Sequence, residues 1–182
     1  MSARLFAALE LPAPVRDALA AFGHAAADGD FALRPVRDDA LHVTLAFLGH
    51  RPLDDIEPAA EAVRAAAAAA PRPLELSLGE PLWLAPRRPH VLTVEVLDGS
   101  GALFALQERV VASLVDAVGY EPERRRFRPH VTVARVRHGA RPRMGDLSEG
   151  PKAAFAGEAV TLYRSYLGGG PARYEPLVRA PV

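Results

Sequence analysis

The sequence predicts an α+β fold with antiparallel strands, in a single domain that spans residues 1–182. Two observations predict this class. Apolar segments of strand length come in pairs joined by short polar turns, and three segments with helical spacing of apolar residues lie between them. Short turns favour antiparallel pairing over a doubly wound parallel sheet. No change of composition marks a linker between separate domains.

The chain begins with a strand and a helix. Residues 3–11 form a continuous apolar run, which is typical of a buried strand. Residues 12–27 start with two prolines and then repeat apolar residues at helical spacing, so we expect a helix there. Residues 31–49 predict a strand, a polar turn at 37–40 and a second strand that Gly49 ends.

The middle of the chain predicts two helices with a hairpin between them. Residues 52–70 are rich in alanine and carry acids in the first turns, which favours a helix that ends at Pro71. Residues 74–86 and 89–98 have the composition of two strands joined by a tight turn. Residues 99–120 predict a third helix, because their apolar residues keep spacings of three and four.

The last third of the chain predicts further strands separated by irregular segments. Residues 121–129 form a polar, arginine-rich loop, and residues 130–136 form a strand. Residues 139–157 are rich in Gly and Pro, and we expect an irregular segment with a short helix. Residues 158–180 predict two closing strands around a glycine-rich turn.

Composition excludes several classes of protein. With 49% hydrophobic and 24% charged residues, the chain matches ordinary globular proteins and is too apolar for a disordered one. No apolar run approaches the ~20 residues that span a bilayer, and the first run lacks a signal-peptide cleavage pattern. We therefore expect no membrane association and a cytoplasmic location. The absence of cysteine excludes disulfides and thiolate ligands. The absence of coiled-coil patterns favours a monomer.

One hexapeptide occurs in two closely similar copies. HVTLAF, which begins at His42, returns as HVTVAR, which begins at His130. Residues two apart in a strand project from the same face, so His42 and Thr44 point together, and so do His130 and Thr132. With six histidines and few threonines in the chain, far fewer than one such pair is expected by chance. The placement of each copy after a helix and a polar loop predicts two related lobes that face each other.

The other histidines lack this arrangement. His90 precedes Thr93 by three residues, a spacing that puts the two side chains on opposite faces of a strand. We interpret His90 as structural. His24, His50 and His138 stand in helix or loop contexts without such a partner, so we expect them to be surface residues.

Positive charge is concentrated around the second copy although the formal net charge of the chain is zero. Eight arginines fall within one short segment: Arg124, Arg125, Arg126, Arg128, Arg135, Arg137, Arg141 and Arg143. The planar guanidinium fork suits phosphate groups. A general bias toward arginine explains the count equally well, but it does not explain the position of the cluster.

The repeated residues suit acid–base chemistry on a phosphate. Two imidazoles that face each other can take a proton from an attacking oxygen and give a proton to a leaving oxygen. Threonine hydroxyls on the same face can donate to phosphoryl oxygens. This chemistry requires neither a metal nor a cofactor, and the chain shows no HExxH motif or tight Asp/His cluster for zinc.

The doubled motif resembles that of the two-histidine (2H) phosphoesterase superfamily, and within it the bacterial and archaeal RNA 2′,3′-cyclic phosphodiesterases, historically called 2′-5′ RNA ligases. The resemblance covers nearly the whole chain in the expected order. It rests on four segments: RLFAALELP, LRPVRDDALHVTLAFLG, RRFRPHVTVAR and LYRSYLGGGPARYEPL. It implies a bilobal α+β fold, with two antiparallel-sheet lobes and flanking helices around a central cleft.

The resemblance also implies an activity and a set of site residues. The activity is hydrolysis of RNA or nucleotide 2′,3′-cyclic phosphate ends to 2′-phosphomonoesters, without a metal. His130 would be the base that activates water and His42 the acid that protonates the departing 3′-oxygen. Thr44 and Thr132 would hold the phosphate. Other 2H activities remain open, namely 2′-5′ RNA ligation and hydrolysis of ADP-ribose cyclic phosphate or oligoadenylate, as does a non-catalytic RNA-binding domain.

Three further residues follow from the resemblance alone. It implies that Arg135 binds the phosphate, yet strand alternation sends Arg135 to the face opposite Thr132, so a bulge or a strand end is required. Arg34 is a candidate RNA contact, and Phe127 is a candidate for stacking on a base. Core or surface roles explain these two residues equally well. Pro35 stands where relatives often carry an aromatic residue, which weakens the expectation of an aromatic contact from that strand.

Overall fold

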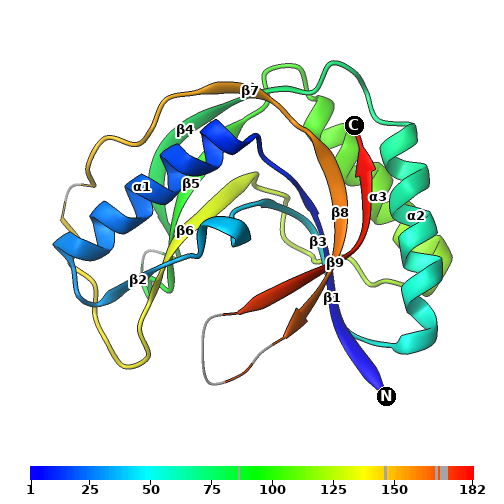
Figure 1. Ribbon diagram of the computed structural model, residues 1–182, viewed down its shortest axis with the longest axis horizontal. Coiled ribbons are helices and arrows are strands. Elements are labelled where there is room, and N and C mark those ends of the chain that lie inside the picture. Colours follow the sequence, from blue (N-terminus) through cyan, green and yellow to red (C-terminus); the bar gives the residue numbers. More distant parts are fainter. Residues whose placement is uncertain (86, 146, 167, 169–171) are drawn as a thin grey trace.

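The protein folds around one strongly curved antiparallel sheet in a computed structural model that describes residues 1–182 except 86, 146, 167 and 169–171 (Figure 1). Nine strands of the described chain form this sheet in the order β7-β4-β5-β6-β3-β1-β8-β9, and β2 pairs with the end of β6. The strands are β1 (Ser2–Leu9), β2 (Leu33–Pro35), β3 (Val43–Pro52), β4 (Glu75–Leu84), β5 (Val91–Leu97), β6 (His130–Val136), β7 (Ala154–Ala156), β8 (Ala159–Tyr166) and β9 (Arg173–Pro181).

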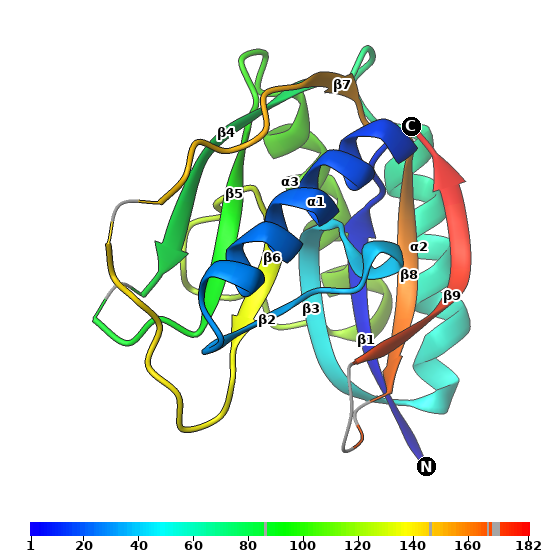
Figure 2. The ribbon, with the colours of Figure 1, turned by 60° about the vertical axis from the view of Figure 1, so that its left-hand side comes forward.

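The helices divide the sheet into two halves. Helix α1 (Ala13–Gly29) packs on β2 and β6, whereas α2 (Ile56–Ala68) packs on β8, β9 and α3 (Ala102–Val118), and α3 also contacts β3. Figures 1 and 2 show α1 on one side of the molecule and the α2–α3 pair on the other. We call β1, β3, β8 and β9 with α2 and α3 the His42 half, and the remaining strands with α1 the His130 half. Two short 3-10 turns, Asp38–Ala40 and Leu53–Asp55, complete the described helical structure.

The two halves join where the repeated hexapeptides meet. Strands β3 and β6 pair through Val43 and Val131, which are both fully buried. The flanking His and Thr residues of both copies are half-buried and lie on the other face of each strand. Antiparallel pairing at this point brings His42 next to the strand that carries Thr132, and His130 next to the strand that carries Thr44. The two lobes expected from the sequence are therefore halves of one continuous sheet.

Both copies carry a β-bulge immediately after the threonine. Against β1, Thr44 pairs with Ala8 and Ala46 pairs with Ala7, so Leu45 is an extra residue in β3. The same holds in the other half for Val133 of β6, as Thr132 pairs with Thr93 and Ala134 pairs with Leu92. In each copy the extra residue and the alanine after it are both buried. A bulge shifts the alternation of all later side chains in its strand by one position.

Contacts from outside the strand ladder accompany both bulges. The Nε2 amide of Gln107 in α3 donates to the carbonyl of Leu45 at 3.2 Å, and the backbone N–H of Val36 donates to the carbonyl of Val133 at 2.9 Å. Helix α1 lies close to the second bulge because Gly23 has no side chain. A Cβ at this position would be 2.6 Å from the carbonyl oxygen of Val133.

The start and end of α3 show why it begins and stops where it does. The carboxylate of Asp98 accepts hydrogen bonds from the backbone N–H groups of Gly101, Leu103 and Phe104, at 2.9 to 3.1 Å, which satisfies the free donors of the first turn. At the other end, Gly119 adopts a left-handed conformation with φ 58°, which terminates the helix.

The antiparallel α+β class, the three helices and the paired strands predicted from the sequence are confirmed. One element was wrong: no helix occurs in the described part of residues 139–157, which is irregular until the short strand β7 pairs with β4. The Gly and Pro residues of this segment disfavour a helix, and its end pairs with the edge of the sheet. The glycine-rich turn between β8 and β9 lies mostly outside the described residues. None of the helices described combines the length and apolar character that a bilayer crossing requires.

Candidate active site

The same backbone contact holds both histidine rings. The Nδ1–H of His42 donates to the carbonyl of Ala40 at 2.8 Å, and the Nδ1–H of His130 donates to the carbonyl of Arg128 at 2.6 Å. In both copies the acceptor lies two residues before the histidine. A carbonyl can only accept, so the proton of each neutral ring must be on Nδ1. Each Nε2 is then the atom with a free lone pair, available for proton transfer.

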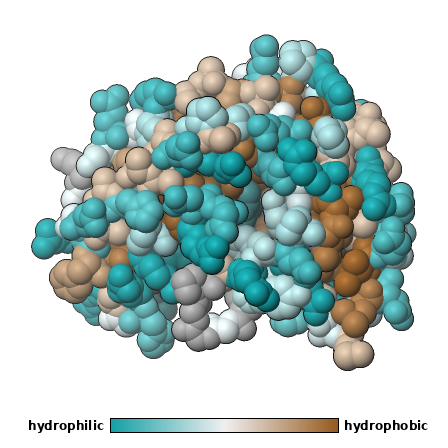
Figure 3. All heavy atoms as spheres, in the orientation of Figure 1, coloured by the Kyte–Doolittle hydropathy of each residue, from teal (hydrophilic) through white to brown (hydrophobic). Residues whose placement is uncertain are grey.

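A small cavity next to His42 collects several of the predicted residues. Its volume is about 230 Å³. It is lined by Arg4, Phe6, His42, Thr44, Phe47, Arg135, Ser165 and Tyr174. The Nε2 of His42 lies 3.2 Å from the Thr44 hydroxyl, which donates to it when the ring is neutral. Figure 3 shows a mostly hydrophilic surface across the centre of the molecule in the view of Figure 1.

Aromatic side chains form the walls around His42. The imidazole stacks on Phe6 with ring centroids 5.0 Å apart, and the edge of Tyr174 approaches it at 5.6 Å. Burial among these rings lowers the pKa of His42 to about 4. The hydrogen bond to Ala40 opposes this shift, and the positive charge of Arg135 adds to it. This shift favours the neutral form of His42 at pH 7.

A polar network next to Phe6 fixes the position of this aromatic wall. Tyr163 stacks on Phe6 with a centroid separation of 5.1 Å, and its hydroxyl donates to Glu10 at 3.0 Å. Thr161 and Arg179 also donate to Glu10, each at 2.6 Å. Burial by itself would raise the pKa of Glu10, but these three hydrogen bonds together lower it. Burial and the neighbouring Glu10 raise the pKa of Tyr163. Tyr163 is thus a neutral, anchored support for Phe6.

Arg135 reaches the cavity because of the bulge at Val133. After the extra residue, Arg135 pairs with Val91, which is two residues from Thr93 and therefore on the same face as the Thr93–Thr132 pair. The structure thus contains the bulge that the sequence required for this arginine. On its other side Arg135 pairs with Arg34 of β2, and both side chains are exposed.

The other predicted site residues, His130, Thr132 and Phe127, do not line the small cavity at His42. His130 is near enough to contribute to the electrostatics of His42, but neither His130 nor Thr132 lines the small cavity. Phe127 packs edge-on against Phe104 with centroids 5.6 Å apart and is partly buried against the apolar core. It does not line the small cavity, and its contact with a base stays a prediction.

Sequence reasoning missed five residues of the cavity wall: Arg4, Phe6, Phe47, Ser165 and Tyr174. The guanidinium of Arg4 lies over the ring of Phe47 at 4.6 Å and donates to the Ser165 hydroxyl at 3.4 Å. Phe47 had a signal in the sequence, because it stands in the first copy where Arg135 stands in the second. The other four lie in segments that carry the family resemblance, but they reach the cavity from β1, β8 and β9, whose pairing no local pattern specifies.

Within the described part of the chain, no group of three or more His, Asp or Glu side chains is arranged to hold a metal ion.

Comparisons with known proteins agree with this architecture. The family model described as the 2'-5' RNA ligase superfamily matches residues 14–169. The RNA 2',3'-cyclic phosphodiesterase of Aeropyrum pernix is 34% identical over 111 residues, which cover 60% of either chain. The protein of the same name from Geobacillus stearothermophilus is 30% identical over 150 residues, covering 81% of this chain and 47% of its own. The alignments thus span about half to three fifths of these relatives.

A solved structure resembles the fold over its full length. E. coli LigT, crystallised in complex with 3'-AMP, superposes with a TM-score of 0.77 and 26% identity, covering 100% of this chain and 99% of that one. The family match includes both copies of the histidine motif. This chain therefore belongs to the 2'-5' RNA ligase superfamily.

Proposed function

We propose that the protein hydrolyses 2′,3′-cyclic phosphate ends of RNA or nucleotides to 2′-phosphomonoesters, with His42 and His130 as the acid–base pair and no metal. One observation carries this proposal: two equivalent strand segments meet at Val43–Val131, and each holds a histidine by Nδ1 so that Nε2 carries the lone pair of the neutral ring. A site with two such nitrogens on opposite sides of a phosphate suits in-line displacement, which needs one proton acceptor and one donor.

Each proton in the reaction has a defined origin and destination. Nε2 of His130 takes a proton from water as the water oxygen bonds to phosphorus. The bond between phosphorus and the 3′-oxygen breaks, and the protonated Nε2 of His42 gives its proton to that oxygen. The products are a 2′-phosphomonoester and a free 3′-hydroxyl. Arg135 and the Thr44 hydroxyl, both in the cavity wall, stabilise the negative charge on the phosphoryl oxygens.

To act as the acid, His42 must become protonated when the substrate binds. Burial and the positive charge of Arg135 favour the neutral form of this ring. An anionic cyclic phosphate in the same cavity opposes that positive charge and favours the imidazolium. Binding of the substrate is therefore coupled to uptake of one proton by His42, which prepares the acid only when a phosphate is present.

The relatives support this reading. Two of them carry the name RNA 2',3'-cyclic phosphodiesterase, and E. coli LigT was crystallised in complex with 3'-AMP. The cavity beside His42 combines a cationic group, hydroxyls and aromatic rings, which suit the phosphate, the sugar and the base of a nucleotide.

The test is hydrolysis of 2′,3′-cyclic AMP and of an RNA with a 2′,3′-cyclic end, in the presence of EDTA, with phosphorus NMR to identify the product. We expect full activity in the chelator, a 2′-phosphate product, and loss of about 10²-fold or more in His42→Ala and in His130→Ala. Unimpaired activity in either variant, or dependence on an added metal, would overturn the proposal.

A further inference from the structure

A second, larger cavity lies beside the candidate active site and is strongly basic. It has a volume of about 1120 Å³, more than the ~300–1,000 Å³ typical of small-molecule pockets. The turn between β4 and β5 and the loop after β6 form most of its wall. It is lined by Arg34, Arg87, Arg88, Pro89, His90, Val136, Arg137, His138, Gly139, Ala140, Arg141, Pro142 and Met144.

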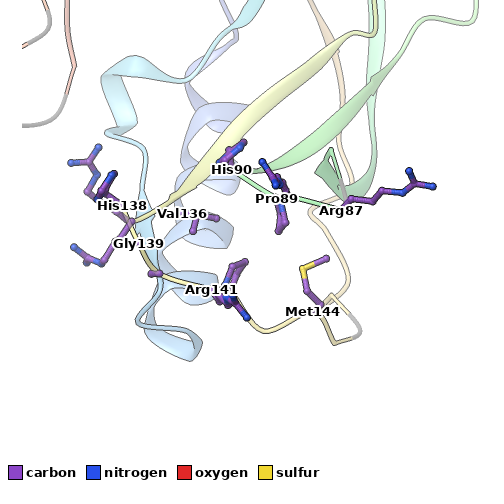
Figure 4. A pocket seen from close by; sticks show the side chains of 13 residues that line it. Arg87, Pro89, His90, Val136, His138, Gly139, Arg141 and Met144 are labelled. Carbon is purple, nitrogen blue, oxygen red and sulfur yellow. The ribbon is translucent and has the colours of Figure 1, made fainter.

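Figure 4 shows how these segments surround the cavity. Pro89 and His90 lie on one side, His138 and Gly139 on another, and Arg141 and Met144 lie across from Pro89 and His90. The side chain of Arg87 extends outward at the rim.

The charge of this wall has one sign. Five arginines contribute to it, whereas no aspartate or glutamate does. None of the ion pairs formed between described residues involves Arg34, Arg87, Arg88 or Arg141. Arg137 differs, because its Nε donates to the carbonyls of Phe31 and Leu33 and ties the loop to the strand. In a chain with a formal net charge of zero, such a concentration points to an anionic partner.

The basic cavity lies next to the small cavity at His42. Arg135 lines the small cavity, and the next residue of β6, Val136, lines the large one. Arg34, which also lines the large cavity, is the cross-strand neighbour of Arg135. Val136 is six residues along β6 from His130, about 20 Å at the usual rise of a strand. A mononucleotide is too short to occupy both places, but a polymer of several nucleotides can.

We propose that this basic cavity binds the RNA strand on the 5′ side of the cyclic phosphate, with Arg87, Arg88 and Arg141 at its backbone phosphates. The inference rests on the proposed function, because a 2′,3′-cyclic phosphate ends the chain and leaves all other nucleotides on the 5′ side. Guanidinium groups suit phosphates. The imidazoles of His90 and His138 and the apolar surfaces of Pro89 and Met144 suit the faces of unpaired bases. The protein then prefers oligonucleotide ends over cyclic mononucleotides.

Binding can be measured separately from catalysis. The probe is a fluorescent single-stranded RNA of eight nucleotides with an ordinary 3′-hydroxyl, titrated with wild type and with the triple variant Arg87→Ala/Arg88→Ala/Arg141→Ala at several salt concentrations. We expect a loss of affinity of about tenfold and a salt slope that decreases by about 0.7 for each phosphate contact removed. Arg109→Ala, an exposed arginine on α3 outside the cavity, serves as control and should bind like wild type.

Kinetics provide the second arm. In the triple variant, kcat/KM for a cyclic-ended octanucleotide should fall about tenfold, while kcat/KM for 2′,3′-cyclic AMP stays at the wild-type level. Unchanged RNA affinity, an equal loss on both substrates, or tighter binding of a poly-glutamate peptide than of RNA would each overturn the inference. If neither substrate is hydrolysed by wild type, the proposed function fails, and the binding arm still decides whether the cavity holds RNA.

Discussion

Phe47 and Arg135 occupy the same position in the two copies of the motif, five residues after their histidines, and both line the cavity that contains His42. Both depend on the extra residue after the threonine, because without a bulge each would point to the opposite face. A β-bulge in each strand thus places an aromatic ring from one half and a cation from the other half in the wall of this cavity. Phe47 in turn carries Arg4 on its face, so two cations border the same cavity.

Arg135 should contribute mainly to stabilising the charge that develops on the phosphate. Replacement by alanine should lower kcat/KM for 2′,3′-cyclic AMP by about 10²-fold, the usual effect of removing one donor to a developing oxyanion. Arg135→Lys keeps the charge but loses the two-pronged donor, and should recover only part of the activity. Steady-state kinetics of both variants measure this. Full activity of Arg135→Ala would contradict a role at the phosphate.

The two histidines should respond differently to a better leaving group. A cyclic substrate with sulfur at the bridging 3′ position expels a thiolate, which needs no proton from an acid. His42→Ala should therefore hydrolyse the sulfur substrate at close to the wild-type rate, while His130→Ala stays slow on both substrates. A bell-shaped pH profile alone cannot make this assignment, because coupled groups titrate as a pair. Rescue of His130→Ala instead of His42→Ala would reverse the two roles and leave the pair intact.

The low pKa of His42 should make stability depend on pH. Its pKa is about 4 in the folded protein and about 6.5 in an unfolded chain, so between these values the unfolded state binds more protons. The free energy of unfolding should therefore fall by about 1.4 kcal/mol per pH unit as the pH drops from about 6.5 towards about 4. No contribution from His42 is expected above that window. Urea unfolding of wild type and of His42→Gln at several pH values measures the difference, and parallel curves would contradict it.

Gly23 should be necessary for the second bulge to lie against α1. In Gly23→Ala the new methyl group meets the carbonyl of Val133, so helix and strand must separate, at a cost of about 1–3 kcal/mol in the free energy of unfolding. Gly29→Ala is the matched control in the same helix, since no described atom lies within 4 Å of its Cβ. The control should be neutral or gain up to about 1 kcal/mol. Urea unfolding compares the two, and equal stabilities would show that the contact does not matter.

Local patterns in the sequence predicted most of the fold because they report directly on it. The helical spacing before Val118, the apolar run at Leu5 and the hairpin before Val91 each depend on neighbouring residues alone. The paired histidines and threonines could also be recognised from the sequence, because two copies of one pattern are not expected by chance in ordinary strands.

Three features have no local signal in the sequence, for physical reasons. A bulge adds one residue without changing composition, and two consecutive buried residues such as Leu45 and Ala46 look like any buried strand. Ser165 and Tyr174 reach the site only through the pairing of β8 with β1 and β9. The β1–β8 pairing joins strands that are far apart in the sequence, so local patterns do not predict it. The basic cavity is built by loops, where periodicity carries no information about position.

The single junction at Val43–Val131 has a consequence for the synthesis of the chain. Strand β2 precedes the first histidine motif but pairs with β6, and β8 and β9 follow the second motif but extend the sheet of the first. Neither half is a continuous piece of polypeptide. During synthesis, the outer strand of the His42 half, β9, is complete only after Pro181 has left the ribosome. The candidate active site, whose wall includes Ser165 and Tyr174, is therefore among the last parts of the molecule to assemble.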